Sequence, residues 1–214
     1  MSLKDYLWLS DKPVLLTRRN IWLFFRYLVL YAFVIHTSLG LIANLRNRSV
    51  KSGEYGAVLL SDHVSDSPAW RKVEGWASAL AWYGAYPYWT YYFNNRGMKA
   101  RWFQRAKAAD LERAIQDPQC VSIVLVGHGS FCLWAASDQD VTNDEVTEYM
   151  KGRPKKKGEW IQLTCGVPDS FPVKMGELVM DKRKVYTYAR SINAYYMVAD
   201  ALFGFKYIKS LRHP

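Results

Sequence analysis

Residues 121–130 read Val-Ser-Ile-Val-Leu-Val-Gly-His-Gly-Ser and are the clearest indication of the fold in the sequence. The first six residues are almost all apolar and rich in β-branched side chains, which predicts a strand buried on both faces. Two glycines around a histidine end the run and predict a polar loop directly after the strand. The segment before it, 104–116, is rich in helix formers with one apolar face, and Asp117-Pro118 ends it. The sequence therefore predicts a helix, followed by a buried strand that ends in a polar loop.

Apolar runs and amphipathic segments alternate on both sides of this stretch. Thr142-Asn-Asp-Glu145 has the pattern of a capping box, which predicts that a helix begins there. Because strands and helices alternate, we expect an α/β domain over 54–214 with a mostly parallel sheet sandwiched by helices. The other predicted strands are 55–60, 98–103, 159–164 and 184–189, and the other predicted helices are 68–84 and 193–204.

Two further segments have more than one interpretation. The stretch 85–93 is dense in aromatic residues, and Pro87 argues against its continuing the helix before it. We expect a strand there, with an aromatic wedge on a membrane interface as the alternative. The tract 152–158 contains three consecutive lysines and predicts a basic loop. Its simplest interpretation is a solvated loop, and contact with anionic lipid or nucleic acid is the alternative.

The segment 21–43 is apolar on every side of a helical wheel and is 23 residues long. A helix of about 20 apolar residues spans the hydrocarbon core of a bilayer, whereas the apolar core of a signal peptide has roughly 7–15. Arg26 and His36 are its ionisable groups apart from two tyrosines. The sequence therefore predicts an N-terminal segment, 1–20, a transmembrane helix, 21–43, and a basic linker, 44–53. The alternative for 21–43 is a buried core helix.

Composition narrows the class of protein. The 214 residues carry a net charge of +10, half of them are hydrophobic, and 15% are aromatic, which excludes a disordered chain. Three widely spaced cysteines exclude a disulfide scaffold, and without a CxxC pair we expect no metal site. The positive charge favours an anionic neighbour, and with an apolar segment in the chain a lipid bilayer is preferred to nucleic acid.

The candidate chemistry lies where two predicted strands end. The first strand ends in Val126-Gly127-His128-Gly129, and the strand at 159–164 ends in Thr164-Cys165-Gly166. Parallel strands bring their carboxyl ends to one edge of a sheet, so His128 and Cys165 are expected to lie close together. An imidazolium beside a thiol stabilises the thiolate and makes it a nucleophile. The amides at Gly129 and Cys165 can then stabilise an oxyanion.

This arrangement resembles the caspase-hemoglobinase fold, the group that includes caspases, legumains, gingipains, separases and bacterial caspase-like proteases. The resemblance covers the domain after the apolar segment and rests on a strand ending in His-Gly followed by a strand ending in Cys-Gly. It implies a cysteine protease that needs no cofactor. It further implies that Cys165 is the nucleophile, that His128 is the general acid and base, and that Gly129 supplies an oxyanion amide. Cys120 and Cys132 are interpreted as structural.

In this family the end of the first strand and the segment after the cysteine help to form the substrate pocket. Here those positions hold Asp62, His63, Asp66 and Asp169. Acidic walls favour an arginine or lysine side chain in the substrate. The alternative is that these acids are solvated loop residues.

We therefore expect a single-pass membrane protein whose C-terminal domain is cytosolic and cleaves a protein substrate near the membrane. Lys and Arg do not fix the orientation, because three flank each side of 21–43. A second hypothesis is a non-enzymatic membrane effector, in which the α/β domain binds a nucleotide or protein and controls oligomerising transmembrane helices. Arg26 and His36 motivate it, since polar groups in a bilayer favour a homo-oligomer or a membrane-protein partner. A third hypothesis is an inactive caspase-like adaptor.

Overall fold

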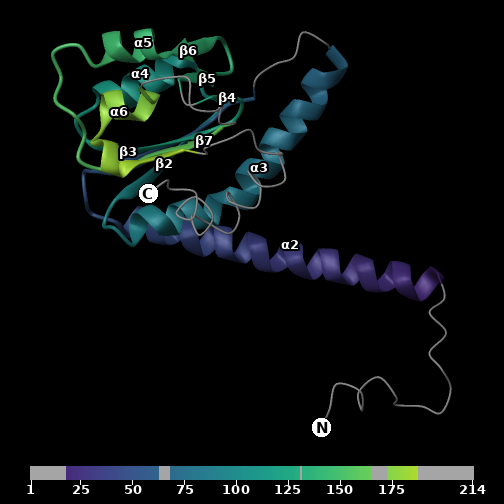
Figure 1. Ribbon diagram of the computed structural model, residues 1–214. Helices are drawn as coiled ribbons and strands as arrows, with labels where there is room; N and C mark the ends of the chain where they lie inside the picture. Colours follow the sequence, from purple (N-terminus) through teal and green to yellow (C-terminus); the bar gives the residue numbers. More distant parts are fainter. Residues whose placement is uncertain (1–17, 63–67, 131, 165–172, 188–214) are drawn as a thin grey trace. The chain divides into compact units, whose positions relative to one another are not determined.

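The computed structural model describes residues 18–62, 68–130, 132–164 and 173–187. The chain divides into two units, Met1–Leu39 and Gly40–Pro214. The second unit contains a five-stranded sheet and its covering helices (Figure 1). The predicted last helix, 193–204, lies outside the described residues.

The five strands are all parallel and stand in the order β2-β1-β3-β7-β8. This confirms the predicted α/β class and the mostly parallel sheet. The strand that contains the apolar run 121–126, β3, lies at the centre between β1 and β7. The bounds are β1 Tyr55–Leu60, β2 Lys99–Gln104, β3 Cys120–Val126, β7 Trp160–Leu163 and β8 Val185–Thr187.

A separate three-stranded antiparallel sheet follows the end of β3. Its strands are β4 Gly129–Ser130, β5 Leu133–Ala135 and β6 Asp140–Thr142. The helix α5, Asn143–Tyr149, begins directly after it, with Thr142 as the N-cap of the predicted capping box. The Thr142 N–H donates to the Glu145 carboxylate at 2.6 Å, which pairs one of the free amides of the helix start.

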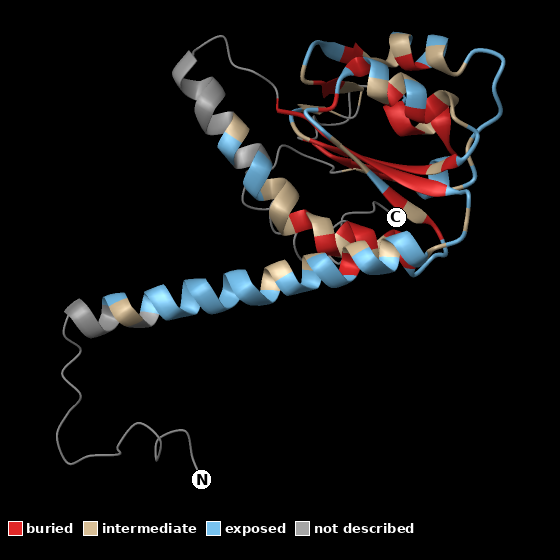
Figure 2. Cartoon of the chain, turned by 180° about the vertical axis from the view of Figure 1, so that it is seen from behind, coloured by how far each residue is buried: buried red, intermediate tan, exposed pale blue. Residues whose placement is uncertain are grey.

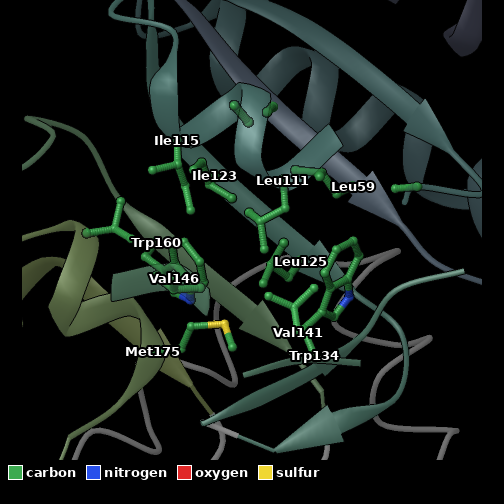
Figure 3. Close-up of a cluster of buried hydrophobic side chains, with 14 of the residues drawn as sticks. Leu59, Leu111, Ile115, Ile123, Leu125, Trp134, Val141, Val146, Trp160 and Met175 are labelled. Atoms are coloured by element: carbon green, nitrogen blue, oxygen red, sulfur yellow. The ribbon is translucent and has the colours of Figure 1, made fainter. Parts of the chain in front are cut away.

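Helices cover both faces of the parallel sheet. On one face, α4 (Ala108–Gln116), α5 and α6 (Met175–Val179) bury apolar side chains against alternate residues of β1 and β3. On the other face, α3 (Pro68–Asn94) buries Ala85, Trp89 and Phe93. Alternate strand residues supply both cores because successive side chains point to opposite faces. Figure 3 shows the first core, whose labelled members are Leu59, Leu111, Ile115, Ile123, Leu125, Trp134, Val141, Val146, Trp160 and Met175.

The aromatic stretch 85–93 is helical, so its prediction as a strand is wrong. α3 runs without a break from Pro68 to Asn94 and contains Pro87 in its interior. Proline removes one helical hydrogen bond, and burial of Trp89 and Phe93 in the sheet core offsets that loss. The ring of Phe93 occupies the space where a Cβ would stand at Gly56 of β1, so this glycine lets helix and strand approach closely.

The apolar N-terminal segment forms α2, Arg18–Ser49, a helix of 32 residues. The 25 residues Phe25–Ser49 are long and apolar enough to cross a membrane. Most of their apolar residues are exposed, as Figure 2 shows. The helix continues beyond the predicted limit at residue 43, so the predicted linker 44–53 is helical over 44–49.

The last turn of α2 is joined to the sheet by Asn47. Its side-chain oxygen accepts from the Ala100 N–H at 2.8 Å, and its Nδ2 donates to the Ala100 carbonyl at 3.0 Å. Ala100 lies in β2, which is an edge strand of the sheet. An edge strand exposes unpaired backbone groups, and the Asn47 amide pairs both of them at this residue. Asn94 of α3 also donates to the Asn47 oxygen at 2.8 Å, so helix, edge strand and α3 are held at one point.

Replacing Asn47 by alanine leaves the outward N–H and carbonyl of Ala100 without these partners. We expect Asn47→Ala to lower the free energy of unfolding by about 1–3 kcal/mol. Thermal unfolding of the full chain in a neutral detergent measures the change. Asn95→Ala is the matched control, because the Asn95 side chain is exposed and accepts from Arg46 rather than from the edge strand. Equal stability losses in the two variants would contradict this role of Asn47.

Candidate functional site

The candidate site lies at the carboxyl end of β3, where the sheet brings two strand ends together. β3 and β7 are neighbours and parallel, with Val126 paired to Leu163. The Gly127 N–H donates to the Leu163 carbonyl at 3.4 Å, so the pairing continues one residue beyond β3. His128 therefore follows β3 at the same edge where Thr164 follows β7. Cys165, the next residue, lies outside the described residues.

Glycine is required on both sides of His128. Gly127 and Gly129 have φ values of 140° and 142°, which side chains rarely adopt. A Cβ at Gly127 would overlap the Ser61 side chain, and a Cβ at Gly129 would overlap the Leu133 carbonyl. The two glycines thus let the chain turn sharply around His128, whose side chain is exposed.

The short β4–β5 hairpin fixes the backbone of Gly129. Gly129 pairs with Trp134, and the Ala135 N–H donates to the His128 carbonyl at 3.1 Å. This bond makes Gly129 and Trp134 a non-hydrogen-bonded pair, in which N–H groups point away from the partner strand. The Gly129 N–H is therefore not used by β5. An oxyanion donor at this position needs that orientation.

Gln162 of β7 holds the hairpin on the sheet. Its side chain is fully buried, and its Nε2 donates to the Ser130 carbonyl and to Thr164 Oγ1, the latter at 3.1 Å. Its Oε1 accepts from the Trp160 indole N–H at 3.2 Å. The Thr164 hydroxyl donates to the same Ser130 carbonyl at 3.3 Å. The strand ends of β3 and β7 are thereby tied to each other through side chains as well as through the sheet.

The structure describes one of the four predicted pocket residues, Asp62, which comes directly after Ser61 at the end of β1. Its carboxylate accepts from Arg105 Nε at 2.7 Å. The Asp62 side chain is 5% exposed, whereas that of Arg105 is 75% exposed. The charge of this carboxylate is therefore already balanced within the chain, and a substrate cation would compete with Arg105. The other three, His63, Asp66 and Asp169, lie outside the described residues.

Two cysteines are described, and they differ in environment. Cys120 is buried at the start of β3, and burial raises the pKa of its thiol to about 11 even though Lys156 favours the thiolate. Such a thiol is unreactive at neutral pH. Cys132 is partly exposed in the hairpin, where its Sγ lies 3.3 Å from Ser130 Oγ. Neither is paired in a disulfide.

Gln162 and Arg105 are two residues of this edge that the sequence did not predict. A glutamine inside an apolar strand is a signal that could have found Gln162, because a buried amide needs hydrogen-bond partners. Nothing in the sequence near Arg105 links it to Asp62, which is 43 residues earlier. Arg105 also has a positive φ of 52°, which is uncommon for a residue other than glycine. This left-handed conformation turns the chain after β2.

Within the described ranges, no group of three His, Cys, Asp or Glu residues is placed to hold a metal ion. Comparison with known proteins adds no relative: no family model matches the chain, and no curated protein matches it.

Replacing Gln162 by leucine keeps the side-chain volume and removes the amide. We expect Gln162→Leu to lower the free energy of unfolding by about 1–3 kcal/mol, because the Ser130 carbonyl and the Trp160 N–H lose a buried partner. Hydrogen exchange of residues 128–135, measured by mass spectrometry, should become faster. Gln104→Leu, at an exposed strand end, is the control. Unchanged exchange in Gln162→Leu would rule out the proposed attachment of the hairpin.

Proposed function

We propose that the chain is a membrane-anchored, caspase-like cysteine endopeptidase in which His128 and Cys165 form the catalytic dyad. The observation that carries the proposal is the parallel pairing of β3 with β7, with Val126 opposite Leu163. Two residues beyond each partner of that pair stand His128 and Cys165. The edge is therefore suited to an imidazole and a thiol that act together.

In the proposed reaction the Cys165 thiolate attacks a peptide carbonyl carbon and forms a tetrahedral oxyanion. The Gly129 N–H donates to that oxyanion. The C–N bond then breaks as the His128 imidazolium gives its proton to the leaving amine, which leaves an acyl-enzyme. His128 next takes a proton from water, and the resulting hydroxide attacks the thioester. Release of the carboxylic acid restores the thiolate.

The geometry of the described residues supports this division of roles. Glycines on both sides of His128 let a substrate backbone come close. Gln162 and Thr164 hold the hairpin, and through it the Gly129 amide, in a fixed position. A rigidly held donor stabilises developing charge without reorganising during the reaction.

The proposed substrate is a protein at or near the same membrane, since α2 is long and apolar enough to anchor the domain there. The proposed preference for a basic substrate side chain rests mainly on Asp66 and Asp169, because Arg105 already offsets the charge of Asp62.

A second candidate, the non-enzymatic membrane effector, is favoured by one observation. Asn47 connects the last turn of α2 directly to the edge strand and to α3. A ligand-induced movement of the sheet would therefore be passed to the apolar helix. Dye leakage from vesicles that contain the wild-type chain and Cys165→Ala separates the candidates: leakage that is unaffected by loss of the thiol favours the effector. An inactive adaptor is expected to cause no leakage and to show no peptidase activity.

Removing either member of the dyad should abolish proteolysis. We expect Cys165→Ala and His128→Ala each to lower kcat/KM for a cleaved peptide by at least about 100-fold. A fluorogenic peptide library, assayed with the full chain in nanodiscs, measures the loss.

Cys132→Ala is the matched control, since it removes a partly exposed thiol of the hairpin after β3 while leaving the proposed dyad intact. Equal rates of peptide cleavage by wild type and by Cys165→Ala would overturn the proposed nucleophile. Unchanged thermal unfolding of each variant excludes loss of the fold as the reason.

A further inference from the structure

A pocket of about 270 Å³ lies at the amino end of β3, opposite the strand ends that carry His128. The turn between α4 and β3 forms one wall, and the basic loop at 152–158 forms another. Its lining residues are Glu54, Ile115, Gln116, Pro118, Cys120, Val121, Arg153, Pro154, Lys155, Lys156 and Lys157. This site takes no part in the proposed peptidase chemistry.

The pocket lining contains four cationic side chains and a single carboxylate, that of Glu54. The lining therefore carries an excess of three positive charges. Three of the cations donate to backbone carbonyls, and for Arg153 the acceptor is the carbonyl of Gln116 at 3.1 Å. Lys155 likewise donates to the Glu177 carbonyl at 2.7 Å.

Lys156 is the most deeply placed of the four. Its ammonium donates to the carbonyls of Asp117 at 2.8 Å and Cys120 at 2.6 Å. Burial lowers its pKa, while neighbouring Cys120 and Asp117 oppose that shift. The loop is therefore not simply solvated, because this lysine fastens it to the start of β3.

None of these four cations lies within 4 Å of a carboxylate oxygen anywhere in the described part of the chain. Carbonyl oxygens orient a cation but do not neutralise it. The pocket thus concentrates positive charge inside a concave surface, where field lines converge and attract an anion. Lys151, which directly precedes this loop, differs, since it pairs with Glu148 at 3.3 Å and does not line the pocket.

We propose that this pocket binds a small ligand through a phosphate monoester group. A phosphate monoester carries about −1.5 to −2 charges at neutral pH, which matches the excess of the lining better than one carboxylate does. In this proposal Arg153 and Lys157 donate hydrogen bonds to the phosphate near the pocket opening. Lys156 supplies positive charge at the bottom of the pocket. The apolar side chains of Ile115, Pro118 and Val121 leave room for a small organic portion.

The phosphate can belong to a soluble molecule or to a lipid headgroup. Thermal unfolding of the full chain in neutral detergent tests the first source with inorganic phosphate, against sodium chloride and acetate at equal ionic strength. Binding to nanodiscs that contain phosphatidic acid, compared with phosphatidylcholine alone, tests the second. Wild type is compared with Lys157→Gln and with the matched control Lys151→Gln.

We expect phosphate to raise the unfolding midpoint of wild type and Lys151→Gln by about 2–4 °C, and that of Lys157→Gln by less than half as much. A dependence on Lys157 confined to the phosphatidic acid arm supports the same site with a lipid as its source. Equal shifts with acetate, or equal responses of the Lys157 and Lys151 variants in both arms, would overturn the proposal. Because Lys157 makes no described side-chain bond, its variant should fold like wild type, and equal midpoints without phosphate verify this.

Discussion

Parallel hydrogen bonding of β3 to β1 on one side and to β7 on the other positions both helical layers and the strand ends. β3 is buried on both faces, so it requires a helical layer on each side. The same pairing brings the ends of three strands to one edge. At that edge Ser61, Gly127 and Thr164 follow β1, β3 and β7 in turn. The register of β3 with β1 and β7 therefore determines which residues form the core. It also determines where the strand ends of the candidate site meet.

The two edges of the sheet have different properties. At the carboxyl edge, glycines and the attached hairpin leave His128 exposed and the Gly129 amide turned away from β5. At the amino edge, Lys156 fastens a cationic loop to the turn before β3. A peptidase site and an anion site on opposite edges would share no residue. Occupation of one could then influence the other only through the strands between them.

Much of the architecture follows from local pattern, and the exceptions have physical causes. β3 and the capping box at Thr142 were predictable because burial and cap geometry need particular residues at fixed spacing. The continuity of α3 through Pro87 was not, since the compensating burial of Trp89 and Phe93 depends on the finished sheet. The pairing of Asp62 with Arg105 was likewise hidden, because it joins the ends of two strands that are distant in sequence. Cys165 remains a prediction from sequence and from the position of β7.

The central claim is that His128 acts on the thiol of Cys165, and the pH dependence of alkylation tests it most directly. Iodoacetamide labelling of Cys165 is followed by mass spectrometry in wild type and in His128→Gln. A histidine-stabilised thiolate should give an alkylation midpoint at or below about pH 7.5 in wild type, and one near 8.5 in the variant. The same midpoint in both proteins would contradict the account.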